Sequence, residues 1–139
     1  MGQIDDYKRQ IDDRKMQIEN IKKYEIEREK RNIEQEKRRI EDHKKRILNY
    51  KNRKKDRAEY YASRLKSASS QHKPNLREAK KRDMESIARS INDEKKSIEK
   101  IKSNIQRYKD QITRHKDKIS DKKNQISSIK DSIKRLKGR

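Results

Sequence analysis

The sequence contains no cysteine, tryptophan or phenylalanine, and only two glycines and one proline occur in its 139 residues. Without cysteine, the chain can form neither a disulfide framework nor a thiolate metal site. Glycine and proline interrupt helices more than other residues do, whereas the abundant Lys, Arg, Glu, Gln and Ile are well tolerated in them. The composition therefore favours long helices.

Hydrophobic residues are also scarce, at 26% of the chain, while charged residues make up 49%. So few apolar side chains cannot bury a globular core of ordinary size, and the chain must be extended or disordered. Low hydrophobicity with high net charge is typical of disorder, but disordered chains rarely keep isoleucine in register over eight repeats, as this sequence does. We therefore expect an elongated helical protein.

Long apolar runs are absent as well. No stretch approaches the roughly 20 apolar residues that cross a bilayer, and no hydrophobic core of a signal peptide follows Met1. A basic helix with an apolar stripe can lie on an anionic membrane, but this stripe is narrow and has no Trp or Phe to seat at the interface. We expect a cytoplasmic protein with no transmembrane segment, and we do not expect membrane binding.

The second half of the chain carries a seven-residue repeat. One apolar residue recurs at every seventh position, namely Met84, Ile91, Ile98, Ile105, Ile112, Ile119, Ile126 and Ile133. A second row, three residues further on, holds Ile87, Ile101, Tyr108, Ile129 and Leu136, with Glu94, His115 and Lys122 in its gaps. These two rows are positions a and d of a coiled coil, and we call them the seam.

The first half repeats the pattern with one interruption. Ile4, Ile11 and Ile18 are seven residues apart, but the next isoleucine in phase, Ile26, comes eight residues after Ile18. The extra residue predicts altered helix winding near residues 24–27. From Ile26 the seven-residue step resumes through Ile33, Ile40 and Ile47, while the second row carries Glu29, Glu36, His43 and Tyr50. The seam is therefore partly polar.

Residues 67–75 are the only stretch rich in turn residues, and they include the single proline, Pro74. Proline breaks a helix interior, and Asn75 is a suitable N-cap for a helix that opens at Leu76. The sequence therefore predicts a first long helix over 1–66, a connector over 67–75 that contains Pro74, and a second long helix over 76–137, as a single elongated unit. The expected fold is an all-α antiparallel hairpin or coiled coil; two collinear helices in a parallel dimer are the alternative.

A break at the middle of the chain also predicts a register. In the antiparallel hairpin, facing residues have numbers that add to about 141–145, which brings Glu29 near His115. The same register sets the basic run 44–57 beside Glu85, Asp93, Glu94 and Glu99 of the second helix.

The seam is thin for a stable hairpin. Burial of an isoleucine contributes about 1.5–3 kcal/mol, whereas ordering a residue costs about 1–2 kcal/mol of backbone entropy. We therefore expect self-association or docking onto a helical protein, in a bundle of two, three or four helices. The predicted assembly seam is Ile26, Ile33, Ile40, Ile47, Met84, Ile91, Ile98, Ile105, Ile112, Ile119, Ile126 and Ile133.

The formal net charge is +20, which raises association with polyanions such as nucleic acid or an acidic protein surface. The candidate polyanion-binding residues are Lys37, Arg38, Arg39, Lys44, Lys45, Arg46, Lys51, Arg53, Lys54, Lys55, Arg57, Lys80, Lys81 and Arg82. In a chain so rich in charge, each cluster is equally well explained as a solvated helix face. Nothing in the sequence supplies an element that reads bases, so nucleic-acid binding would be through phosphates.

The remaining residues favour neither catalysis nor metal binding. The sequence has no glycine-rich phosphate loop and no nucleophile with a base at a recognisable spacing, so no catalytic residue, cofactor or enzymatic activity is expected. His43 and His115 occupy seam positions without a second histidine four residues away, and no metal site is expected. Among the tyrosines, we expect Tyr24 and Tyr60 to be exposed, where they could stack on bases.

The sequence thus predicts a non-enzymatic structural or adaptor protein that acts through coiled-coil assembly and has a strongly basic surface. The alternative is a sequence-nonspecific nucleic-acid-binding or ribosome-binding protein.

Overall fold

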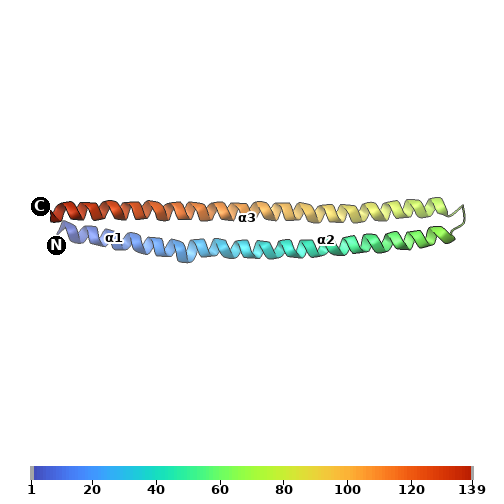
Figure 1. The fold of residues 1–139 in the computed structure, drawn as a ribbon, viewed down its shortest axis with the longest axis horizontal. Helices are drawn as coiled ribbons and strands as arrows, with labels where there is room; N and C mark the ends of the chain where they lie inside the picture. The colour runs from blue at the N-terminus through green and yellow to red at the C-terminus, as the bar shows by residue number, and fades with distance from the viewer. Residues whose placement is uncertain (1, 139) are drawn as a thin grey trace. The chain divides into compact units, whose positions relative to one another are not determined.

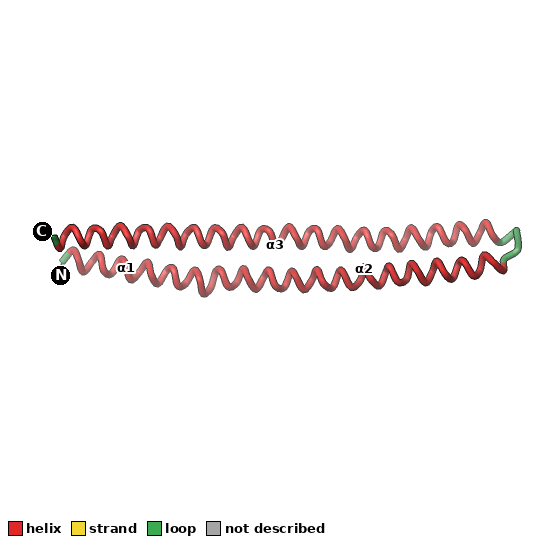
Figure 2. Tube along the Cα trace, in the orientation of Figure 1, coloured by secondary structure: helices red, strands yellow, loops and turns green. Residues whose placement is uncertain are grey.

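A computed structural model describes residues 2–138 of the chain (Figures 1 and 2). It contains α1 (Gln3–Asn20), a π-helical segment η1 (Ile21–Ile26), α2 (Glu27–Ser67) and α3 (Lys73–Lys137). Within the described residues there is no strand, and no helix is long and apolar enough to span a membrane. The predicted all-α class is confirmed.

Contacts group the chain into two units. Unit 1 comprises Met1–Gln35 and Ile105–Arg139, and unit 2 comprises Glu36–Asn104. Each unit pairs the first half of the chain with part of α3. The single elongated unit expected from the sequence stays a prediction.

In unit 1, α1, η1 and the start of α2 pack antiparallel against the C-terminal part of α3 (Figure 1). The buried core is made of isoleucines from both halves of this helix pair. They are Ile11, Ile18, Ile21, Ile26, Ile119, Ile126, Ile129 and Ile133, with Ile4, Tyr7 and Ile112 packed against them. Arg14 Nε donates to Gln125 Oε1 at 2.9 Å, and Lys122 Nζ donates to Gln17 Oε1 at 2.8 Å, so the seam is flanked by side-chain hydrogen bonds.

Unit 2 is a helical hairpin, in which α2 and α3 are joined by the turn over residues 68–72 (Figure 2). Its buried apolar residues are Ile40, Tyr61, Ile87, Ile98 and Ile101. The Tyr61 hydroxyl donates to Asp83 Oδ2 at 2.5 Å, and Arg57 Nε lies 3.7 Å from the same oxygen. Polar contacts to Asp83 thus join the helices where the isoleucine repeat of α2 has ended.

Both units are antiparallel pairs formed within one chain, which confirms the predicted antiparallel arrangement over the parallel dimer. The register is shifted slightly. The numbers of hydrogen-bonded or ion-paired residues across the helices add to between 137, for His43 with Glu94, and 144, for Tyr61 with Asp83. The shift arises because α3 begins earlier than expected, which moves the centre of the turn toward the N-terminus.

Pro74 and Asn75 lie inside α3, so their predicted place in the connector was wrong, as was the N-cap role of Asn75. The helix starts at Lys73, three residues before Leu76. Proline is tolerated there because a first-turn N–H has no partner within its helix. The Ser69 carbonyl accepts from the N–H groups of His72 and Lys73, both at 3.1 Å, and closes the turn.

The extra residue between Ile18 and Ile26 is absorbed by the π-helical segment η1. A π-turn holds one more residue than an α-turn, so Ile18, Ile21 and Ile26 all stay on the buried side. The predicted change in winding is confirmed, with its start at Ile21 rather than Tyr24.

Deletion of Lys22 tests this account. Removing one residue makes the seven-residue step continuous, so η1 should become α-helical while the seam stays in phase, and the thermal midpoint should stay the same or rise. Deletion of Lys116, an exposed residue within the unbroken repeat of α3, is the matched control. This control deletion should rotate isoleucines off the seam and lower the free energy of unfolding by about 1.5–3 kcal/mol for each isoleucine that becomes exposed. Circular dichroism melts measure both, and a loss with the Lys22 deletion as large as with the control would contradict the account.

The stability of unit 2 should depend on pH at Tyr61. The hydrogen bond from Tyr61 to Asp83, followed by burial, raises the pKa of the Tyr61 hydroxyl above its usual value of 10.0. Folding therefore favours the protonated phenol, so this contribution to stability is complete below pH 10 and is lost as the pH rises through the higher folded pKa. The difference in unfolding free energy between the native chain and Tyr61→Phe should shrink above pH 10 in urea titrations. Tyr60→Phe, which changes an exposed ring, should show no such dependence.

Candidate functional site

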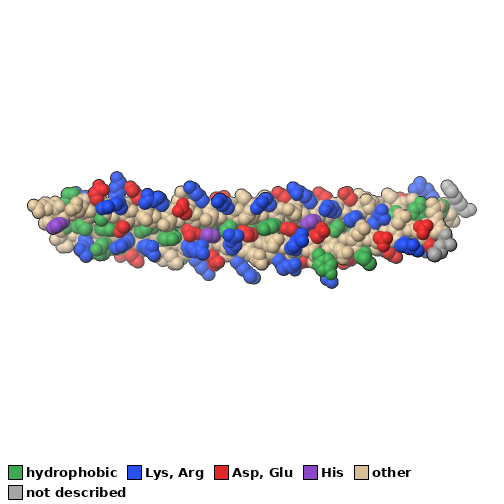
Figure 3. Space-filling model, turned by 180° about the vertical axis from the view of Figure 1, so that it is seen from behind, with side chains coloured by type: hydrophobic (Ala, Val, Ile, Leu, Met, Phe, Trp, Pro, Cys, Tyr) green, Lys and Arg blue, Asp and Glu red, His purple; other side chains and the backbone are tan. Residues whose placement is uncertain are grey.

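The seam residues face the interior of their own units. In the predicted assembly seam, Ile26, Ile33, Ile40, Ile98, Ile105, Ile119, Ile126 and Ile133 are buried, and Ile47, Met84, Ile91 and Ile112 are half-buried. Figure 3 shows the hydrophobic side chains as a narrow line between the helices, with Lys and Arg along the outer edges. None of the described side chains is completely enclosed, so the core is thin.

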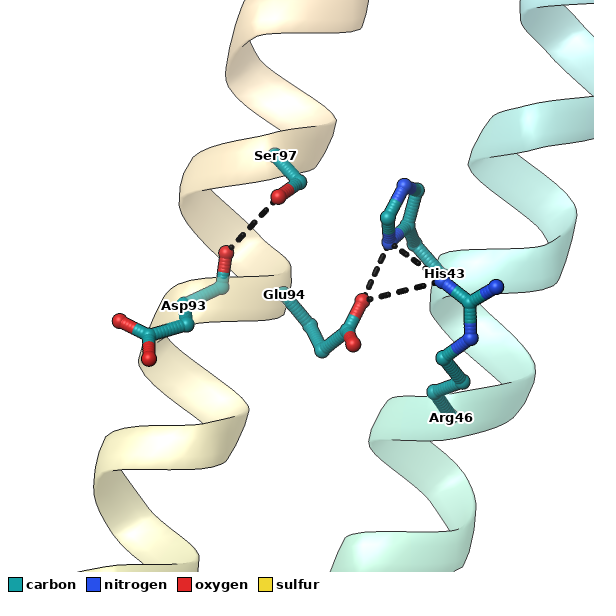
Figure 4. Close-up of polar contacts among 5 residues, drawn as sticks. All are labelled: His43, Arg46, Asp93, Glu94 and Ser97. Atoms are coloured by element: carbon teal, nitrogen blue, oxygen red, sulfur yellow. Dashed lines mark hydrogen bonds and ion pairs between the residues drawn. The ribbon is translucent and has the colours of Figure 1, made fainter.

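A polar contact interrupts the seam of unit 2 at His43. Glu94 reaches from α3 toward α2, where its carboxylate accepts from His43 Nδ1 and lies 3.7 Å from Arg46 Nη1 (Figure 4). The neighbouring Asp93 points away from α2, and its carbonyl oxygen accepts from Ser97 Oγ at 3.1 Å. Of the acidic residues predicted to face the basic run 44–57, Glu94 makes this contact, whereas Glu85, Asp93 and Glu99 are exposed.

Unit 1 has a corresponding polar contact at His115. Its Nδ1 lies 3.1 Å from Glu25 Oε2, but the two groups are not oriented for a hydrogen bond. The predicted partner, Glu29, is one turn further along and is 4% exposed, with Oε2 buried and without a hydrogen-bond partner. The register was predicted to bring Glu29 near His115, and the contact with His115 is made by Glu25, one turn earlier. Glu36, in unit 2, also has a buried unpaired oxygen.

Shallow grooves run along both flanks of the unit 1 seam. One groove, of about 560 Å³, is lined by Lys15, Ile18, Glu19, Lys123, Ile126, Ser127 and Lys130, and we call it the Ile18–Ile126 groove. Ile18 and Ile126 are seam residues, and the other five residues are exposed. The groove thus has apolar residues at its base and three lysines against one glutamate at its rim. The sequence predicted the two isoleucines as seam residues. The rim residues come together only through the register between the helices.

The basic candidates are all in unit 2. Thirteen of the fourteen residues are exposed, and Lys80 is half-buried. Residues 36–104 hold 23 Lys and Arg against 11 Asp and Glu, a net charge of +12, whereas the remaining residues carry 21 against 13, a net charge of +8. Both helices contribute, since residues 37–57 lie on α2 and residues 80–82 on α3. The structure thus brings the basic clusters together in one unit.

Tyr60 lies beside this basic region. It is 42% exposed, and Tyr24 is 60% exposed, which confirms the predicted exposure of both rings. The guanidinium carbons of Arg57 and Arg64 lie 5.4 and 5.1 Å from the centre of the Tyr60 ring. Sequence reasoning missed Arg64, although its position one turn after Tyr60 places the two side chains on one face of the helix.

Among residues 2–138, no group of three or more His, Asp or Glu side chains is placed to hold a metal ion. Comparisons of the chain with models of protein families, with curated proteins and with solved structures give no match. Two features of the molecule bear on its function: the Ile18–Ile126 groove of unit 1 and the basic surface of unit 2.

Proposed function

We propose that the protein is a non-enzymatic structural or adaptor protein that acts through coiled-coil contact with a helix of another protein. The observation that carries this proposal is the Ile18–Ile126 groove, where seam residues lie at the base of an open flank. A two-helix seam leaves such flanks uncovered, and a third helix with apolar residues at seven-residue spacing covers them.

Charge identifies the kind of helix that fits. Lys15, Lys123 and Lys130 line the rim, so acidic residues beside the apolar row of the incoming helix would be complementary. A second copy of this chain fits less well, because each copy carries a net charge of +20 and repels the other. An acidic amphipathic helix is therefore the proposed partner.

The unsatisfied seam atoms support assembly as well. Glu29 Oε2 and His115 Nε2 are buried in unit 1 without hydrogen-bond partners. A buried polar group that lacks a partner costs about 1–3 kcal/mol, so the isolated pair of helices is less stable than its isoleucine content suggests. A third helix along the seam would offset part of this cost if these side chains turned toward its polar groups.

The test uses two synthetic 28-residue peptides of identical composition. One has Leu and Ile at the seam positions of four seven-residue repeats with Glu at the flanking positions, and the other has the same residues in scrambled order. The repeat peptide should bind in isothermal titration calorimetry, and the scrambled peptide should not. Equal binding of both peptides would show that only net charge matters and would overturn the proposal.

Charge reversal locates the contact. Lys123→Glu with Lys130→Glu should weaken binding of the repeat peptide about fivefold or more, because each exposed ion pair contributes about 0.2–1 kcal/mol and reversal adds repulsion. Arg114→Glu with Arg135→Glu is the control, since both residues are exposed, lie outside the groove and change the net charge equally. Sedimentation at 10–200 µM checks for self-association, and a stable dimer would replace the proposed partner by a second copy.

A further inference from the structure

The most basic part of unit 2 is the segment 44–57 of α2. It contains eight Lys and Arg, which are Lys44, Lys45, Arg46, Lys51, Arg53, Lys54, Lys55 and Arg57, against one acidic residue, Asp56, for a net charge of +7. The segment is about 20 Å long at about 1.5 Å per residue, so it presents one net positive charge per ~3 Å. One strand of duplex nucleic acid presents a phosphate about every 3.4 Å. The two charge densities match.

Six of the eight basic residues surround the outward side of the helix, while Lys54 and Arg57 continue the two seam rows and are also exposed. Their places follow from the seven-residue spacing of the seam residues Ile40 and Ile47. One side of the seam is flanked by Lys44 and Lys51, and the other side by Arg46 and Arg53. Lys45 faces outward. A rigid acidic helix would meet one such row, with a cation about every 10.5 Å. A phosphodiester chain can turn between rows, so nucleic acid fits this surface better than an acidic helix does.

Most of these cations are available. Arg46 and Arg57 lie 3.7 Å from carboxylates of α3, and Lys44 lies 3.6 Å from Glu41, all with side chains about half exposed or more. In the part of the chain that the structure describes, Lys45, Lys51, Lys54 and Lys55 have no carboxylate partner within 4.0 Å. Exposed ion pairs contribute little, so phosphates can replace the existing partners.

Tyr60 adds an aromatic contact at the end of this segment. Its ring makes an edge-on contact with Tyr61, with centroids 5.2 Å apart, and Tyr61 is fixed by its hydrogen bond to Asp83. The guanidinium groups of Arg57 and Arg64 lie over the Tyr60 ring, so a base stacks there by displacing one of these two exposed side chains. An aromatic ring beside arginines is the arrangement on which bases of single strands stack.

We propose that residues 44–57 of α2, together with Tyr60, form a binding surface for the phosphodiester backbone of nucleic acid, without preference for base sequence. Phosphates contact the lysines and arginines, and an unpaired base stacks on Tyr60. This surface is in unit 2 and is independent of the helix-binding groove of unit 1, so either proposal can fail without the other.

Fluorescence anisotropy with a 20-nucleotide single-stranded RNA and a 20-base-pair DNA duplex tests the proposal between 50 and 200 mM salt. Both probes should bind the full chain, with dissociation constants of about 1–100 µM at 150 mM salt, and the affinity should fall steeply as salt rises. A poly-glutamate peptide of equal charge should bind at least tenfold more weakly. Equal binding of poly-glutamate, or no binding of either nucleic acid at 50 mM salt, would overturn the proposal.

Matched variants locate the surface. Lys45→Gln, Lys51→Gln, Lys54→Gln and Lys55→Gln together should reduce the slope of log affinity against log salt by up to about 3 for RNA. The control, Lys109→Gln, Lys116→Gln, Lys134→Gln and Lys137→Gln, removes the same charge from exposed positions of unit 1 and should change the slope by less than half as much. Equal effects of both sets would show a diffuse charge effect and would contradict the proposed location.

Tyr60→Ala separates stacking from charge. It should weaken single-stranded RNA binding about 5- to 100-fold and leave duplex binding within twofold, because only an unpaired base can stack on the ring. Circular dichroism of each variant establishes that the helices are intact. Equal losses for both probes would exclude stacking at Tyr60.

Discussion

The structure depends on the pairing of isoleucines across two antiparallel helices of one chain. With 26% hydrophobic residues, the chain can afford only a narrow apolar row on each helix, and Ile11, Ile18, Ile119 and Ile126 show how that row is used in unit 1. Because the apolar residues face each other within each unit, the outward surface is formed mainly by charged and uncharged polar side chains. The surfaces proposed for binding result from this separation of apolar residues inside each unit from polar residues outside.

Much of this fold follows from residue spacing alone. Isoleucine at every seventh position predicts the helices and their contacting sides, and the eight-residue step from Ile18 to Ile26 predicts the change in winding that appears as η1. The start of α3 was harder to predict, because Pro74 is equally compatible with a turn and with the first turn of a helix. That difference of three residues moved the register and gave His115 the partner Glu25 instead of Glu29.

The two candidate sites also differ in how far the sequence predicts them. The exposure of Lys45 and Tyr60 follows from their distance from the seam positions, so sequence was sufficient for these residues. The rim of the Ile18–Ile126 groove joins Lys15 with Lys123 and Lys130, which are more than 100 positions apart in the chain. Such a group depends on the register between helices, which the seven-residue repeat by itself leaves open in steps of one heptad.

That ambiguity accounts for the polar residues in the seam. Identical isoleucines pair equally well after a slip of seven residues, whereas polar pairs do not. A slip would set Glu94 against Glu36, two carboxylates, or against Tyr50, and it would set His115 against Ile18 or Asn32 in place of Glu25. Polar residues at seam positions fix register at some cost in stability. His43 contacts Glu94 in unit 2, and Glu25 contacts His115 in unit 1. Each antiparallel pair thus has its own contact that distinguishes the native register, and the Ile18–Ile126 groove is assembled only in that register.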